Sequence, residues 1–102
     1  LNLTEDPGRG GVEEEQLLSL AEKILAVERI SLLGVMAVAG LNKDPRSEFE
    51  RAIKLSQKLR SVAPDASKLS LGMSEDYQVA ISMGATHIRV GSAITGPRPI
   101  SA

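Results

Sequence analysis

Cysteine is absent from this chain of 102 residues, and its only aromatic side chains are Phe49 and Tyr77. Without cysteine there is no disulfide framework and no thiolate ligand for a metal ion. Two aromatic rings are too few to form a surface on which nucleic-acid bases stack. The net charge of −1 provides no general attraction to nucleic acid or to an anionic membrane. We therefore expect no nucleic-acid partner.

Long apolar runs and targeting signals are also missing. No stretch approaches the roughly 20 apolar residues that span a bilayer, and no segment resembles a signal peptide. Hydrophobic residues make up 42% of the chain and charged residues 25%, as in an ordinary soluble fold. These features predict a cytoplasmic protein without a membrane partner. The length is that of one domain or part of one.

Apolar segments alternate with segments of helical periodicity. The run Leu32–Ala39 is apolar throughout, as in a strand that is buried on both faces of a parallel sheet. Apolar residues at helical spacing predict helices before and after it, over about 13–28 and 47–62. Ser47 is the expected N-cap of the second helix, and Glu50, three residues later, completes a capping box.

Further strands and a third helix extend this alternation. Lys68–Leu71 and His87–Val90 are predicted strands, separated by a helix over about 75–83 that ends at Gly84. A short apolar segment, Leu1–Thr4, is the first strand. Four strands alternating with helices predict an α/β fold with parallel strands and right-handed crossovers. Such a chain is either half of a (β/α)8 barrel of the TIM type or a small open sheet.

Two strand ends have a composition that suits a phosphate group. In Ser70–Ser74 and in Arg89–Ser92, a strand end is followed by a glycine and then by a serine that starts a helix or turn. Glycine allows an anion to approach backbone N–H groups, and a helix N-terminus adds a favourable dipole. The last two loops of a (β/α)8 barrel commonly form a phosphate site. The alternative for each motif is a turn followed by a serine N-cap.

Arg89 lies between two apolar residues of a predicted strand, where an unpaired guanidinium is costly. We expect it either to point into a polar site or to pair with a carboxylate at a sheet edge. The single histidine, His87, has no second ligand at a suitable spacing, so we expect no metal site.

These motifs resemble those of the pyridoxal phosphate homeostasis proteins, whose barrel is similar to the N-terminal domain of alanine racemase. The resemblance rests on Ser70–Asp76, Met83–Thr86 and Ile88–Ile94, and it extends through Leu33–Ala37 to Asn2–Leu3 near the start of the chain. It implies that the cofactor is pyridoxal 5′-phosphate (PLP). It also implies phosphate contacts from Ser74, Gly91 and Ser92, and apolar contacts to the ring or the phosphate loop from Met36 and Met73.

The resemblance places Arg89 against the pyridine nitrogen of the cofactor. A cation there keeps that nitrogen unprotonated and weakens the ring as an electron sink. In the family, the lysine that forms the Schiff base lies in an N-terminal segment that has no counterpart in residues 1–102. We therefore expect residues 1–102 to be the C-terminal half of the barrel, a fragment that holds the phosphate without the covalent bond.

The function implied by the resemblance is PLP binding for intracellular PLP homeostasis, without established turnover, so we expect a binding protein rather than an enzyme. One alternative is a fragment of a racemase-type PLP enzyme, which would need a further β domain to supply a catalytic base. Another is half of an unrelated phosphate-binding barrel enzyme. A four-stranded half-barrel has two unpaired edges and an uncovered inner face. We therefore expect self-association or pairing with the missing N-terminal half.

Overall fold

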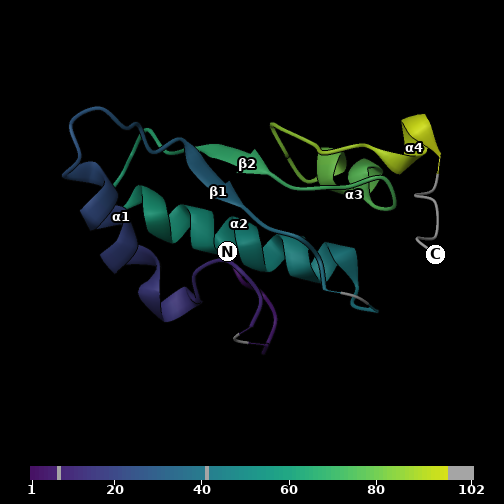
Figure 1. Ribbon diagram of the computed structural model, residues 1–102, viewed down its shortest axis with the longest axis horizontal. Coiled ribbons are helices and arrows are strands. Elements are labelled where there is room, and N and C mark those ends of the chain that lie inside the picture. The colour runs from purple at the N-terminus through teal and green to yellow at the C-terminus, as the bar shows by residue number, and fades with distance from the viewer. Residues whose placement is uncertain (7, 41, 97–102) are drawn as a thin grey trace, which may run out of the picture.

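A computed structural model describes residues 1–6, 8–40 and 42–96. The predicted alternation of helices and strands is confirmed in this part of the chain (Figure 1). The elements follow the order η1 (Glu14–Gln16), α1 (Leu17–Leu25), β1 (Gly34–Met36), α2 (Pro45–Arg60), β2 (Lys68–Ser70), α3 (Tyr77–Ser82) and α4 (Ser92–Thr95).

The sheet is built from β1 and β2, which pair in parallel along their whole length. The segment at His87 extends the sheet on the other side of β2, where Ser70 and His87 form a single parallel bridge. The His87 N–H donates to the Leu69 carbonyl at 3.0 Å, and the Arg89 N–H donates to the Gly72 carbonyl at 2.9 Å. Neighbours in the sheet are therefore neighbours in the sequence, as in a (β/α)8 barrel.

The N-terminal segment lies beside β1 without forming a ladder. The Leu1 nitrogen donates to the Met36 carbonyl at 2.7 Å, and the Asn2 N–H donates to the Val12 carbonyl at 2.9 Å. The prediction of four full strands is therefore wrong for the described residues, in which two strands form. Each of the two flanking segments makes only a few hydrogen bonds to its neighbour, too few for a ladder.

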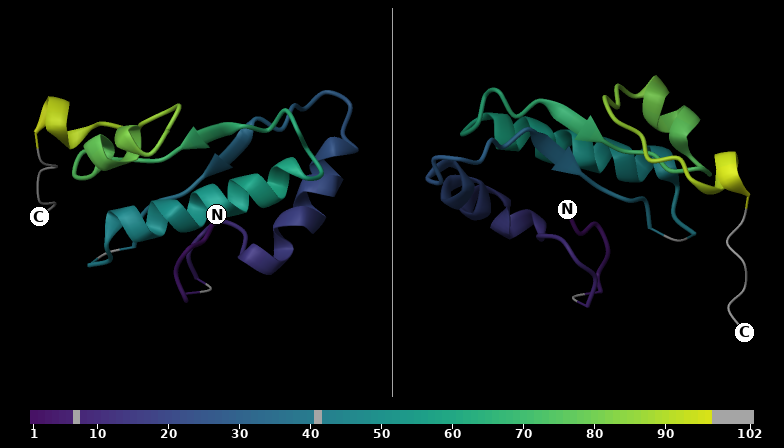
Figure 2. Two further views of the ribbon diagram at one scale, coloured as in Figure 1. Left: turned by 180° about the vertical axis from the view of Figure 1, so that it is seen from behind. Right: turned by 45° about the horizontal axis from the view of Figure 1, so that its top comes forward.

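Helix α2 forms the centre of the core. It packs on β1, and α1 and α3 pack against it in turn, so the helices and the two strands form two layers (Figures 1 and 2). Phe49 and Leu59 of α2 are fully buried, as is Leu71 directly after β2. Within the described residues, each helix is too short or too polar to cross a bilayer.

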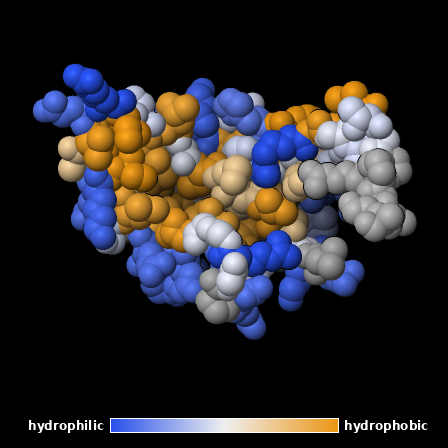
Figure 3. Space-filling model, in the orientation of Figure 1, coloured by the Kyte–Doolittle hydropathy of each residue, from blue (hydrophilic) through white to orange (hydrophobic). Residues whose placement is uncertain are grey.

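The apolar run that contains β1 is buried on one face only. Val35 and Ala37 are buried against the helical layer, whereas Leu33, Met36 and Val38 are 63%, 52% and 40% exposed. Apolar surface is correspondingly visible over α1 and β1 (Figure 3). The prediction of a strand covered on both faces is wrong here, because the helices of the described residues lie on one side of the sheet.

Helix α2 begins earlier than the sequence predicted. Its N-cap is Asp44, whose Oδ1 accepts a hydrogen bond from the Arg46 N–H at 3.3 Å, and Pro45 occupies the first helical position. Proline suits that position because its φ is already helical and its missing N–H would have had no partner. Ser47 and Glu50 therefore lie inside the helix, and the predicted capping box is wrong.

The boundaries of the other helices differ less from expectation. The first predicted helix is divided into η1 and α1, and α3 starts at Tyr77 rather than at about residue 75. The end of α3 is confirmed. Gly84 follows it with a φ of +103°, and the Ala85 N–H donates to the Ala80 carbonyl at 3.0 Å, which closes the helix.

Candidate functional site

The two glycine–serine motifs predicted from the sequence meet in the structure. Ser74 lies in the loop after β2, and its Oγ accepts hydrogen bonds from the N–H groups of Gly91, at 3.1 Å, and Ala93, at 3.0 Å. These two donors belong to the start of α4, on the neighbouring segment of the chain. Among the described residues the Ser74 hydroxyl has no acceptor of its own, so its proton is available to a ligand.

The backbone of the Ser74 loop is shaped by Gly72 and Asp76. Gly72 has a φ of +99°, and a Cβ at this position would lie 2.8 Å from the Cβ of Ala80 and 3.0 Å from the Cα of Tyr77. Only glycine fits this turn without displacing α3. The Met73 N–H donates to Asp76 Oδ1 at 2.8 Å, which ties the loop to the start of α3.

The start of α4 is open to solvent. Ser92 is exposed, and among the described residues its backbone N–H and its hydroxyl have no hydrogen-bond partner. A Cβ at Gly91 would meet no other atom within 4 Å, so the space beside this glycine is free. A ligand can therefore approach the backbone here closely.

Arg89 lies across the carboxyl ends of β1 and β2. Its Nη2 donates to the Ala37 carbonyl at 2.8 Å and to the Ser70 carbonyl at 3.3 Å, and its Nε donates to Ser70 Oγ at 3.2 Å. In the described part of the chain no carboxylate forms an ion pair with this guanidinium, so the predicted alternative of an edge arginine paired with an acid is wrong. The Nη1 group has no partner among the same residues.

The uncovered face of the sheet forms a concavity of about 500 Å³ around Arg89. Met36 and Ser70 line it together with Arg89, whereas Met73 lies in the Ser74 loop, 43% exposed and outside this lining. The predicted site residues thus fall into two groups, one around Arg89 and one around Ser74. The chain joins the two groups directly, since each of the segments Ser70–Ser74 and Arg89–Ser92 contains residues of both.

Several groups at this site were not predicted. The Ala37 carbonyl carries no signal in the sequence, because every residue has one. Lys68 also lines the concavity, and its position two residues before Ser70 in a strand was the signal that places both on one face. The His87 Nδ1 lies 2.9 Å from Thr86 Oγ1, and the described residues contain no cluster of three or more potential metal ligands.

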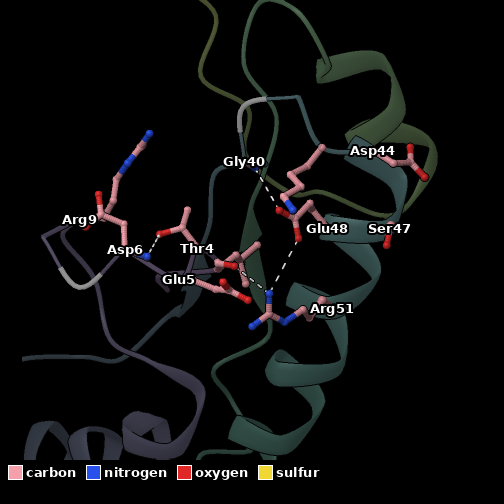
Figure 4. Close-up of a pocket in the computed structure, with 11 residues that line it drawn as sticks. Thr4, Glu5, Asp6, Arg9, Gly40, Asp44, Ser47, Glu48 and Arg51 are labelled. Atoms are coloured by element: carbon pink, nitrogen blue, oxygen red, sulfur yellow. Dashed lines mark hydrogen bonds and ion pairs between the residues drawn. The ribbon is translucent and has the colours of Figure 1, made fainter.

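A second pocket, of about 800 Å³, lies between the N-terminal segment and the start of α2 (Figure 4). Arg51 donates to the Leu3 carbonyl at 2.8 Å and lies 3.9 Å from the Glu48 carboxylate, which accepts a hydrogen bond from the Gly40 N–H at 3.2 Å. These contacts hold the N-terminal segment and the loop after β1 against α2. The charged side chains of Glu48 and Arg51 in this pocket therefore stabilise the fold.

Comparison with known sequences identifies relatives over nearly the whole chain. The family of the alanine racemase N-terminal domain matches residues 1–99. The pyridoxal phosphate homeostasis protein of Mycobacterium bovis is 35% identical over 101 residues, and that of Escherichia coli is 32% identical over 108. The matches cover 96% and 99% of this chain but 39% and 44% of the relatives, so the chain spans about two fifths of their length.

Solved structures agree with this assignment. PipY of Synechococcus elongatus, determined with PLP bound, is 27% identical and superimposes with a TM-score of 0.76 over 90% of this chain and 45% of its own. An unknown protein from Bifidobacterium adolescentis superimposes with a TM-score of 0.72, at 26% identity, over 89% of this chain and 39% of its own. The fold is thus a partial α/β domain of this kind, and the chain belongs to the pyridoxal phosphate homeostasis family of alanine racemase N-terminal-like domains.

Proposed function

We propose that the protein binds PLP for intracellular PLP homeostasis without catalysing a reaction, and that this chain supplies the phosphate-binding loops. The observation that carries the proposal is the meeting of two loops at one oxygen, Ser74 Oγ, which accepts hydrogen bonds from Gly91 and Ala93. The fold shared with PipY, whose structure holds PLP, supports the same ligand.

The phosphate would lie between Ser74 and Ser92. A phosphate monoester carries about −1.5 to −2 charges at neutral pH and accepts several hydrogen bonds. The free proton of the Ser74 hydroxyl, and the N–H and hydroxyl of Ser92, are among the donors that remain free here in the described residues. The open space beside Gly91 allows the ligand to reach them. Met73, next to Ser74 in the loop, stays a predicted apolar neighbour.

The ring would lie over the concavity that contains Met36 and Arg89. PLP supplies an electron sink when its ring nitrogen is protonated, and the Arg89 guanidinium disfavours that protonation because it is itself a cation. The relatives named pyridoxal phosphate homeostasis proteins support a binding protein over a racemase-type enzyme.

In this proposal residues 1–102 are the C-terminal half of a (β/α)8 barrel, and the Schiff-base lysine lies outside them. Lys68 is at the amino end of β2, and Lys23 and Lys54 are on helices. The uncovered face and the segments beside β1 and β2 would be completed by an N-terminal half or by a second copy of the chain. A cytoplasmic location likewise stays a prediction.

Phosphorus NMR with deoxypyridoxine phosphate, a PLP analogue without the aldehyde, tests the phosphate site independently of any lysine. We expect the chain to shift and broaden the phosphate resonance. Ser74→Ala should weaken binding about 10- to 100-fold, since a hydrogen bond to a charged group contributes about 1.5–3 kcal/mol.

Ser82→Ala is the matched control, because this exposed serine of α3 donates its hydroxyl to the Val79 carbonyl at 2.7 Å, away from both loops. Circular dichroism of both variants establishes that they remain folded. If the unmodified chain leaves the phosphate resonance unchanged, or if Ser74→Ala binds as well as Ser82→Ala, the proposed site is wrong.

A further inference from the structure

We propose that Ser70 is a positioning residue, whose hydroxyl holds the Arg89 guanidinium so that its Nη1 edge stays free for the ring of the cofactor. The inference rests on the proposed function, since it concerns the same site. It adds a residue of β2 for which the resemblance implied no role and which touches no part of the proposed phosphate site.

The contacts of Arg89 are confined to one edge of the guanidinium. Nε donates to Ser70 Oγ at 3.2 Å, and Nη2 donates to the carbonyls of Ala37 at 2.8 Å and Ser70 at 3.3 Å. Because the guanidinium is planar and rigid, fixing Nε and Nη2 fixes the plane of the whole group and the direction of Nη1. Nη1 has no partner among the described residues, and Arg89 lines the concavity on the uncovered face.

The Ser70 hydroxyl is the only side chain among these partners. The two carbonyls belong to the backbone of neighbouring parts of the sheet and hold Nη2 alone. Without the hydroxyl, Nε loses its acceptor, and the guanidinium can turn about the bonds of its long side chain. The cation would then stay near the site without a fixed orientation.

Orientation matters because the acceptor on the cofactor is directional. An unprotonated pyridine nitrogen accepts one hydrogen bond, in the plane of the ring. A guanidinium N–H held in that direction donates to it and resists its protonation, whereas a freely turning cation does so less. Ser70 would thereby influence the protonation of the ring nitrogen without touching the cofactor.

The first test is made on the ligand-free chain. Proton–nitrogen NMR measures the exchange of the Arg89 Nε–H with water, which we expect to quicken about fivefold to tenfold in Ser70→Ala because one hydrogen bond is lost. Ser70→Thr keeps the hydroxyl and should restore slow exchange. Ser31→Ala is the control, since Ser31 lines the same concavity and makes no side-chain hydrogen bond among the described residues.

The second test follows the absorbance of bound deoxypyridoxine phosphate as the pH is lowered. In the unmodified chain the ring nitrogen should protonate at a lower pH than in the free analogue. In Ser70→Ala this protonation should move back toward that of the free analogue, and in Ser70→Thr it should not. Affinity should fall less than in Ser74→Ala, because the phosphate contacts remain.

The outcomes separate this inference from the proposed function. Failure of the unmodified chain to bind the analogue would overturn the proposed function and, with it, the ring half of the inference. If Ser70→Ala binds the analogue and has the same Nε–H exchange and the same pH profile as the unmodified chain, only the inference is overturned. Ser70→Ala is expected to lose the slow Nε–H exchange and the lowered protonation pH of the bound analogue. If Ser70→Thr does not restore them, the inference is also overturned, because the hydroxyl is then not their cause.

Discussion

Replacing Gly72 by alanine should destabilise the fold through two effects that the structure separates. The φ of +99° is unfavourable for any residue with a Cβ, at a cost of about 1–2 kcal/mol. The new Cβ would also lie 2.8 Å from the Cβ of Ala80 and 3.0 Å from the Cα of Tyr77, so α3 must shift. Such overpacking typically costs about 1–3 kcal/mol. We therefore expect the free energy of unfolding to fall by about 2–5 kcal/mol.

Gly84→Ala is the matched control for the backbone effect. Gly84 has a φ of +103°, close to that of Gly72, yet a Cβ there would meet no atom within 4 Å. We expect the free energy of unfolding of Gly84→Ala to fall only by the backbone contribution, about 1–2 kcal/mol. Urea denaturation followed by circular dichroism measures this change. Gly91→Ala, with open space and no positive φ, should lose least. A Gly72→Ala chain that is as stable as Gly84→Ala would refute the argument from packing.

The remaining predictions concern the start of α2 and the uncovered face. Asp44→Ala should lower the free energy of unfolding by about 1 kcal/mol because it removes the N-cap, whereas Ser47→Ala should change it by less than about 0.5 kcal/mol; equal losses in urea denaturation would contradict the assignment of the cap. In sedimentation equilibrium the chain should be larger than a monomer, and Leu33→Glu combined with Met36→Glu should dissociate it by placing charges on the uncovered face. A folded monomer before these substitutions would show that this face needs no partner.

Local signals in the sequence were sufficient for the order of α1, β1, α2, β2 and α3. Apolar periodicity predicted α1 and α2, and apolar runs located β1 and β2, because burial against one neighbouring layer already imposes these patterns. Gly84 ends α3 as predicted, since a left-handed residue after a helix is a requirement of the backbone itself. The glycine–serine motifs similarly identified the loops that meet at Ser74.

Where two local signals competed, contacts distant in the sequence favoured one of them. Asp44 with Pro45 and Ser47 with Glu50 are both acceptable helix starts. In the structure the Glu48 carboxylate accepts from the Gly40 N–H, and Arg51 donates to the Leu3 carbonyl. These contacts hold the first turns of α2 in place, and no pattern within the helix predicts them. The covering of β1 on one face agrees with the predicted half-barrel, because right-handed crossovers place the helices on the same side of the sheet.

The sequence by itself determined the kinds of residue at the site. A glycine and a serine follow each of two predicted strands, and the second of these strands contains Arg89. Only the tertiary structure decided what these residues do to one another. The Arg89 guanidinium rests on the carbonyl of Ala37, 52 positions earlier, and Ser74 Oγ accepts from Gly91, 17 positions later. A backbone carbonyl or N–H is chemically the same at every residue, so its partner is fixed by the parallel pairing that brings the strand ends together.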